Sequence, residues 1–267
     1  MTGLPHRYLF VAGLHRTGTS LLARMIAAHS QISAIENAPV PENEGAYLQG
    51  AIPHTALSGR PGHYATDPAQ HLVEGDPLDR LETRNRLEAD WALWFDPAKP
   101  WRVEKSPVNL TRMRLLQQLF PLCQFVVILR HPAAMAAALE KWVDTPPAKL
   151  TDYALDAYEQ ALDDCAYLHS AMVVRYEDLV RRPAAHLAAI HRFCGLDGEP
   201  SDLALRDGNA DYPAATEMSP EQTRRAKRLG YGSALGAGQW EPVVRHSLRE
   251  TREAVSDLLS QGRSGEP

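Results

Sequence analysis

The sequence contains no long hydrophobic run. A membrane-spanning helix requires roughly 20 consecutive apolar residues, and no segment of the chain approaches that length. The first apolar run, Tyr8 to Leu14, leads directly into the polar residues His15 and Arg16, so it does not have the form of a signal peptide. We therefore expect a soluble protein that is located in the cytoplasm and has no membrane partner.

Cysteine is also scarce. The three cysteines, Cys123, Cys165 and Cys194, are widely spaced and form no CxxC pair. A disulfide-rich secreted domain or a thiolate zinc site would need more closely spaced cysteines. The pattern excludes these two classes and favours three small, buried, apolar side chains in a reducing compartment.

The chain has no excess of positive charge. Lys and Arg together number 28, against 33 Asp and Glu, which gives a formal net charge of −5. Proteins that bind DNA or RNA are usually basic overall, so we expect no nucleic-acid partner, and any anionic ligand must be bound by local basic groups. A hydrophobic content of 44% and a length of 267 residues are typical of a single folded domain.

Short apolar runs alternate with amphipathic segments along most of the chain. Strands are predicted at Tyr8 to Ala12, Trp101 to Glu104, Gln124 to Leu129 and Met172 to Val174. Helices are predicted after Ser20, from Val108 to Leu119, after Pro132, from Leu155 to Cys165, from Pro183 to Cys194 and from Val244 to Leu258, followed by a frayed tail over 261–267. This alternation predicts an α/β fold, with a P-loop-like central parallel sheet and helices on both faces.

Residues 37–101 interrupt this regular pattern. They contain many of the prolines and glycines and show weak periodicity, with one helix expected around Leu78 to Phe95. Long irregular insertions in compact enzymes are usually substrate-binding elements. The aromatic residues of this region suggest either a pocket for an apolar or aromatic small molecule or part of the core; they are Trp91, Trp94, Phe95 and Trp101.

The turn between the first strand and the first helix has the composition of a phosphate-binding loop. The spacing of Gly13 and Gly18 matches GxxxxGK[ST], but Thr19 occupies the lysine position. In such loops backbone N–H groups and the helix N-terminus bind phosphate oxygens, and the lysine reaches the β- and γ-phosphates. The loop is therefore poorly suited to triphosphate chemistry but suited to a single terminal phosphate, with Arg16 as its cation.

Several segments resemble the superfamily of sulfotransferases that use 3'-phosphoadenosine 5'-phosphosulfate (PAPS). Arg16-Thr17-Gly18-Thr19-Ser20 is similar to the family's 5'-phosphosulfate loop. Further matches follow in the family's order: Glu104-Lys105-Ser106-Pro107 to E-K-[ST]-P, Phe125 to Pro132 to a strand ending in R-[DN]-P, Val174 to Leu179 to [RK]-Y-E-D-L, and Gly238-Gln239-Trp240 to G-x-W. The resemblance is closer to the bacterial and tyrosylprotein-type branches, which use a glutamate base, than to the cytosolic histidine branch.

The resemblance implies a donor site built from matching residues. Arg16, Thr17, Gly18, Thr19 and Ser20 would hold the phosphosulfate. Arg130 would bind the 3'-phosphate, Tyr176 would lie near the adenine, and the basic run around Arg228 would cover the donor together with Trp240. The acids Glu177 and Asp178 are expected only to favour the N-terminus of the next helix.

One position departs from the family. A serine usually stands eight residues after the 3'-phosphate arginine and donates to the same phosphate, but here that position is Ala138. The missing hydrogen bond to a charged acceptor is worth about 1.5–3 kcal/mol. Either another group replaces it or the site binds the phosphate less strongly.

The resemblance also implies the catalytic groups. Lys105 and Arg16 would stabilise the charge that grows on the departing bisphosphate. Pro107 stands where the histidine branch has its base, so a glutamate after the first helix is expected instead, with Glu36 ranked first, Glu44 second and Glu42 a further candidate. The histidines His54, His63 and His71 of the insertion are outside possibilities.

The sequence thus predicts one sulfotransferase domain over residues 1–267. Its parts would be the phosphosulfate loop at 13–20, the acceptor-binding insertion at about 37–101, the 3'-phosphate strand and helix at 124–143 and a C-terminal basic loop and helix at 222–260. The predicted reaction transfers a sulfonyl group from PAPS to a hydroxyl or amine of a small molecule without a metal. Two alternatives stay open: a P-loop small-molecule kinase, and a donor-binding protein that has lost turnover.

Overall fold

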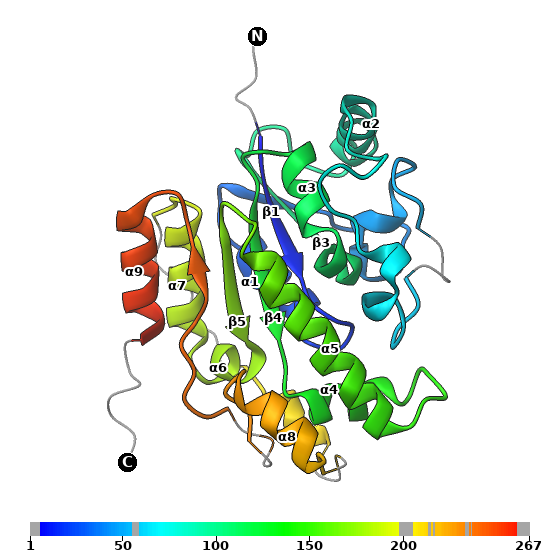
Figure 1. The fold of residues 1–267 in the computed structure, drawn as a ribbon. Coiled ribbons are helices and arrows are strands. Elements are labelled where there is room, and N and C mark those ends of the chain that lie inside the picture. Colours follow the sequence, from blue (N-terminus) through cyan, green and yellow to red (C-terminus); the bar gives the residue numbers. More distant parts are fainter. Residues whose placement is uncertain are drawn as a thin grey trace.

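The computed structural model describes residues 6–54, 59–197, 205–212, 215, 217–232, 235 and 237–260. Within these residues a six-stranded sheet with the order β2-β3-β1-β4-β5-β6 forms the centre of the molecule (Figure 1). The strands are β1 (Arg7–Ala12), β2 (Ile32–Ala34), β3 (Trp101–Lys105), β4 (Gln124–Leu129), β5 (Ala171–Arg175) and β6 (Val244–Arg245). Neighbouring strands are parallel in the pairs β2–β3, β3–β1, β1–β4 and β4–β5, and β6 is antiparallel to β5.

Helices cover both faces of the sheet, as predicted. They are α1 (Thr19–Ala27), α2 (Leu81–Ala92), α3 (Met113–Leu119), α4 (Pro132–Leu139), α5 (Pro147–Cys165), α6 (Tyr176–Arg181), α7 (Pro183–Phe193), α8 (Pro220–Lys227) and α9 (Arg249–Ser260). None of the helices in the described ranges combines the length and apolarity needed to cross a membrane.

Side-chain alternation along β1 explains the two layers. Successive residues of a strand point to opposite faces, so Tyr8 and Phe10 join one core with α2, α3 and α5, while Leu9 and Val11 join a second core with α1, α7 and α9. Because both faces are buried, the strand reads as a continuous apolar run. The predicted α/β class is confirmed.

The C-terminal helix prediction was partly wrong. Val244 lies in β6, where it pairs with Met172 of β5, and α9 begins only at Arg249. Leu248, predicted on the buried stripe, is exposed. The edge of β5 offers backbone hydrogen bonds to this short strand. Pairing with β5 therefore determines the structure at Val244, although the spacing of its apolar residues predicts a helix. The predicted frayed tail lies outside the described residues.

The insertion contains the one long helix that was predicted, α2, joined to short 3-10 turns. Its aromatic residues belong to the cores on the two faces of the sheet rather than to an acceptor pocket. Trp91, Phe95 and Trp101 are each less than 5% exposed; Trp91 and Phe95 lie in the core with α2, α3 and α5, against which Trp94 packs, and Trp101 lies in the second core. Tyr8 lies within 6.0 Å of both Trp91 and Phe95, measured between ring centroids. The suggestion of an aromatic acceptor pocket therefore loses its basis. The three cysteines are buried and unpaired, as expected.

Candidate active site

The glycine-containing loop joins the end of β1 to the start of α1. Gly18 adopts φ 100°, and a Cβ there would lie 2.8 Å from Cδ2 of Tyr176, so only glycine fits this position. Thr17 donates its hydroxyl to the Leu14 carbonyl at 2.7 Å and closes the turn. No side chain in the described part of the chain caps α1, so its first N–H groups are available to an anion.

Arg16 stands at the tip of this loop with φ 68° and is exposed. Its guanidinium carbon lies 4.9 Å from the ring centroid of Trp142, a residue outside the motifs that predicted the site. Its carbonyl accepts a hydrogen bond of 2.8 Å from Nη1 of Arg130. The loop is thereby fastened to the segment that follows β4.

Arg130 is 5% exposed, yet it has no carboxylate partner among the described residues. Its Nε donates to Oδ1 of Asn209 at 2.7 Å, and its Nη2 has no hydrogen-bond partner in the ranges the structure describes. The guanidinium carbon lies 4.6 Å from the ring centroid of Tyr176. Buried charges in folded proteins are normally paired, so the unpaired Arg130 guanidinium leaves a position that suits an anion.

The segment after β5 supports the same region. The Tyr176 ring packs against Gly18, and its hydroxyl accepts a 2.7 Å hydrogen bond from the Gly208 N–H. Glu177 accepts hydrogen bonds from the His131 N–H and from Nδ2 of Asn209, and Asp178 pairs with Arg175 at 2.7 Å. The two acids lie in the first turn of α6, as expected. Glu177 also holds two neighbours of Arg130, namely His131 and Asn209, and this contact has no local signal in the sequence.

Lys105 ends β3 and is 6% exposed. Its Nζ donates to the Glu42 carbonyl at 2.9 Å and lies 3.3 Å from Oε1 of Glu44. Burial raises the pKa of the Glu44 carboxyl to about 7, and Lys105 offsets only part of that rise. The structure thus brings together a lysine and an acid that are 61 residues apart in the sequence.

Glu104 fastens the insertion to β3. It is 1% exposed, and its carboxylate accepts hydrogen bonds from the Gly45 N–H at 2.9 Å, the Ser106 hydroxyl at 2.6 Å and Nδ2 of Asn109 at 2.6 Å. Burial raises the pKa of this carboxyl, and the hydrogen bonds from Ser106 and Asn109 oppose that rise. Because Gly45 is anchored here, the adjacent Glu44 is held beside Lys105.

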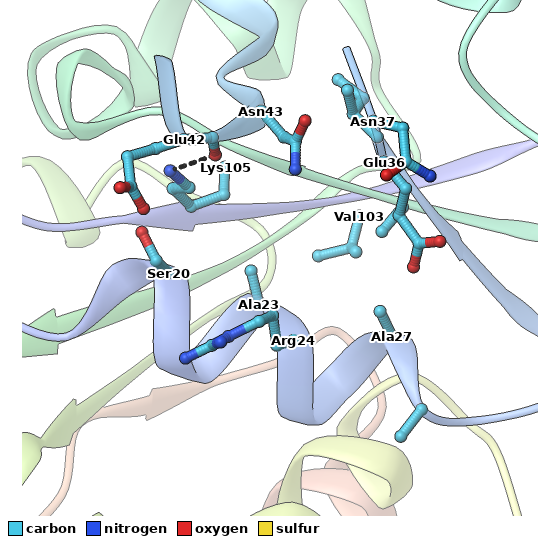
Figure 2. A pocket seen from close by; sticks show the side chains of 13 residues that line it. Ser20, Ala23, Arg24, Ala27, Glu36, Asn37, Glu42, Asn43, Val103 and Lys105 are labelled. Carbon is cyan, nitrogen blue, oxygen red and sulfur yellow. Dashed lines mark hydrogen bonds between the residues drawn. The ribbon is translucent and has the colours of Figure 1, made fainter. Parts of the chain in front are cut away.

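A pocket of about 820 Å³ lies between α1 and residues 34–43, with Lys105 in its wall (Figure 2). Ser20 and Arg24 line it from α1, and Glu36 and Glu42 line it from the opposite side. Figure 2 shows the Glu42 carboxylate directed toward Ser20, whereas Glu36 lies at the other end near Ala27. Lys105 and Glu36 therefore face one cavity, with Glu36 farther from the loop, and Glu44 joins them through its contact with Lys105.

The candidate histidines lie elsewhere. His71 is hydrogen-bonded to Asp164, with 2.8 Å between Nε2 and Oδ2, and the His54 ring packs edge-on against Tyr47. Neither these two nor His63 lines the pocket. His15, inside the loop, was not singled out: burial and the nearby Lys105 charge lower its pKa to about 4, so it is neutral at pH 7.

The C-terminal candidates occupy the end of β5. Trp240 packs on Arg175, whose guanidinium carbon is 5.2 Å from the indole centroid and whose Nη2 donates to the Gly238 carbonyl. Arg228 is exposed where α8 ends, and the neighbouring Arg225 pairs with Glu159 of α5 at 2.8 Å. Part of the basic run therefore binds α8 to α5.

The loop after β1, Lys105 as the last residue of β3 and Arg130 after β4 all lie at the carboxyl ends of parallel strands. That edge is where open α/β sheets bind ligands. A strand, a glycine loop and an uncapped helix flanked by two buried cations are features that this chain shares with α/β proteins that bind phosphorylated ligands.

Comparison with known proteins identifies the family. The model of the sulfotransferase family matches residues 9–200, so the chain belongs to that family. The sulfotransferase domain from the curacin biosynthetic pathway aligns over 87% of this chain and 100% of its own, at 18% identity and a TM-score of 0.52, which confirms the fold. The sulfotransferase domain from the Synechococcus PCC 7002 olefin synthase aligns over 96% and 95% at 17% identity and a TM-score of 0.49. No curated protein matches the sequence.

Proposed function

We propose that this sulfotransferase transfers a sulfonyl group from PAPS to a hydroxyl or amine of a small molecule, without a metal ion. The observation that carries the proposal is the contact between Lys105 and Glu44 beside a pocket that Ser20 of the loop also lines. The contact supports a mechanism in which Lys105 serves the leaving group and Glu44 serves as the base for the acceptor, next to the loop that would hold the phosphosulfate.

The donor site is proposed on the residues that fit its anionic groups. The uncapped N-terminus of α1 and the loop from Arg16 to Ser20 suit the phosphosulfate. The unpartnered Nη2 of Arg130 suits the 3'-phosphate, because a guanidinium offers forked donors to phosphate oxygens. Tyr176 offers an aromatic ring for the adenine. Arg228 and Trp240 are proposed to cover the bound donor.

In the proposed mechanism the acceptor oxygen or nitrogen attacks sulfur while the bond from sulfur to the bisphosphate oxygen breaks. Glu44 takes the acceptor proton, and Lys105 and Arg16 stabilise the negative charge that passes to the bisphosphate. Glu44 is preferred to Glu36 as the base because it contacts Lys105 and because burial raises its pKa to about 7. Glu36, which faces the same pocket, is the alternative.

The pocket favours a polar acceptor. Its described lining contains no aromatic side chain, and carboxylates, amides and one arginine provide hydrogen-bonding groups, while alanines of α1 leave room. We therefore propose a small polar acceptor held between α1 and the insertion, in a single domain that acts in the cytoplasm with neither nucleic acid nor membrane as partner.

A turnover assay with sulfur-labelled PAPS tests the function. With a panel of polar hydroxyl and amine acceptors, labelled product should form at the same rate with and without a chelator. A kinase would instead need ATP and Mg²⁺, as the triphosphate chemistry of its loop requires. Binding of the donor without transfer to water or to any acceptor would indicate a protein that has lost turnover.

A further inference from the structure

Tyr212 lies against two positively charged side chains. It follows a 3-10 turn (Gly208–Asp211), and its ring centroid is 5.5 Å from the guanidinium carbon of Arg130 and 5.2 Å from Nζ of Lys141. The two cations come from different segments: Arg130 directly follows β4, and Lys141 lies two residues after the end of α4. A single aromatic ring therefore brings both into one neighbourhood.

No carboxylate neutralises this pair within the described residues. Asn209 links Arg130 to Glu177: its Oδ1 accepts a hydrogen bond from Nε of Arg130, and its Nδ2 donates one to Glu177. Asp211, beside Tyr212, is bound to Arg206. Two like charges against one ring repel each other, and an anion bound between them would remove that cost.

Lys141 also follows, by three residues in the sequence, the position where the family's serine is missing. Ala138 is 1% exposed and lies in the last turns of α4, three residues before Lys141. Its methyl group donates no hydrogen bond. Lys141 is exposed, and its flexible stem allows the ammonium group to move toward a ligand.

We propose that Lys141 is a second cation for the donor's 3'-phosphate, acting beside Arg130 and positioned by Tyr212. The inference rests on the proposed function, because PAPS and its product carry that phosphate. Lys141 thus makes the contact with the 3'-phosphate that Ala138 cannot make. Arg130 makes the other contact with this phosphate, from a buried position.

Calorimetry with two nucleotides tests whether Lys141 binds the 3'-phosphate. Adenosine 3',5'-bisphosphate and adenosine 5'-monophosphate differ only in the 3'-phosphate, so the ratio of their dissociation constants isolates its recognition. For Lys141→Gln we expect bisphosphate binding to weaken about tenfold, equivalent to 1.4 kcal/mol, and monophosphate binding to stay unchanged. The control is Lys149→Gln, an exposed lysine in the first turn of α5, which should change neither constant.

The outcomes separate the two proposals. A Lys141→Gln protein that retains the wild-type ratio overturns the role of Lys141 and leaves the donor assignment standing. Equal weakening of both nucleotides also overturns it, since the effect would not depend on the 3'-phosphate. A wild-type protein that binds both nucleotides equally well contradicts the proposed donor itself, and the inference fails with it.

Discussion

Lys105 is a buried lysine whose two hydrogen-bonding partners, the carbonyl of Glu42 and the carboxylate of Glu44, both come from the insertion. These contacts fix the ammonium group beside the pocket before any ligand binds. Such preorganised charge is effective in catalysis because it needs no rearrangement as the reaction proceeds.

Replacing Lys105 with methionine keeps the apolar stem and removes the charge. If Lys105 acts mainly on the transition state, we expect kcat to fall by about 10²–10³-fold, while the dissociation constant of adenosine 3',5'-bisphosphate changes little. Steady-state kinetics and calorimetry measure the two quantities. The matched control is Lys149→Met, and a normal kcat for Lys105→Met would show that the charge has no catalytic role.

Glu44 should control the pH dependence of the reaction. A base must be deprotonated to accept a proton, and the pKa of this carboxyl is raised to about 7, so activity should rise as the pH increases through about 7. Glu44→Gln should lower kcat by about 10²–10⁴-fold and abolish that limb of the profile. Glu36→Gln is the control. If Glu36→Gln loses the limb and Glu44→Gln keeps it, Glu36 is the base.

At the scale of elements, the loop before α1 depends on Gly18. Alanine at this position would adopt φ 100° and approach Tyr176 to 2.8 Å. The backbone conformation alone costs about 1–2 kcal/mol for a residue with a Cβ, and the contact adds to that cost. We expect Gly18→Ala to lower the melting temperature and to weaken binding of adenosine 3',5'-bisphosphate.

Gly75→Ala separates the two causes. Gly75 has φ 80°, and a Cβ there would meet no atom within 4 Å. Gly75→Ala should lower the melting temperature through its backbone conformation alone, because no steric contact is added. The dissociation constant of adenosine 3',5'-bisphosphate, measured by calorimetry, should not change. Similar effects of the two substitutions would mean that the contact with Tyr176 is unimportant.

The sequence predicted the buried central strands well and the edges of the sheet poorly. Gln124 to Leu129 was predicted with its observed bounds, because a strand buried on both faces leaves a continuous apolar run. β2 has three residues and β6 has two, too few to produce a periodic signal. Such edge strands form because a neighbouring strand offers hydrogen bonds, which is information held elsewhere in the chain.

The candidate site also contains features that the sequence predicted and features that it did not. The turn between β1 and α1 could be predicted because its residues are consecutive and because Gly18 adopts a conformation, φ 100°, that favours glycine. The contact of Lys105 with Glu44 could not be ranked first, because it depends on how Glu104 anchors Gly45 across an irregular segment. Asn209, which holds Arg130 in place, lies 79 residues from it and has no local signal.

At the scale of the whole molecule, ligand binding should stabilise the fold selectively. A ligand present at 100 times its dissociation constant adds about 2.7 kcal/mol to the free energy of unfolding. We expect adenosine 3',5'-bisphosphate to raise the melting temperature and ATP with Mg²⁺ to raise it much less, because Thr19 replaces the lysine that binds β- and γ-phosphates. Equal or greater stabilisation by ATP with Mg²⁺ would favour the kinase alternative.

The central position of β1 has a consequence for how the chain folds. Tyr8 and its register partner Arg102 are separated by 94 residues, and β4 follows later still. At a synthesis rate of about 5–20 residues per second, the strand waits roughly 5 to 20 seconds for its first neighbour. Its apolar residues and both hydrogen-bonding edges are unpaired during that time, which exposes the nascent chain to aggregation. In refolding from denaturant the whole chain is present, but the strand must still pair across 94 residues. We expect refolding to be slow, with a yield that falls as protein concentration rises.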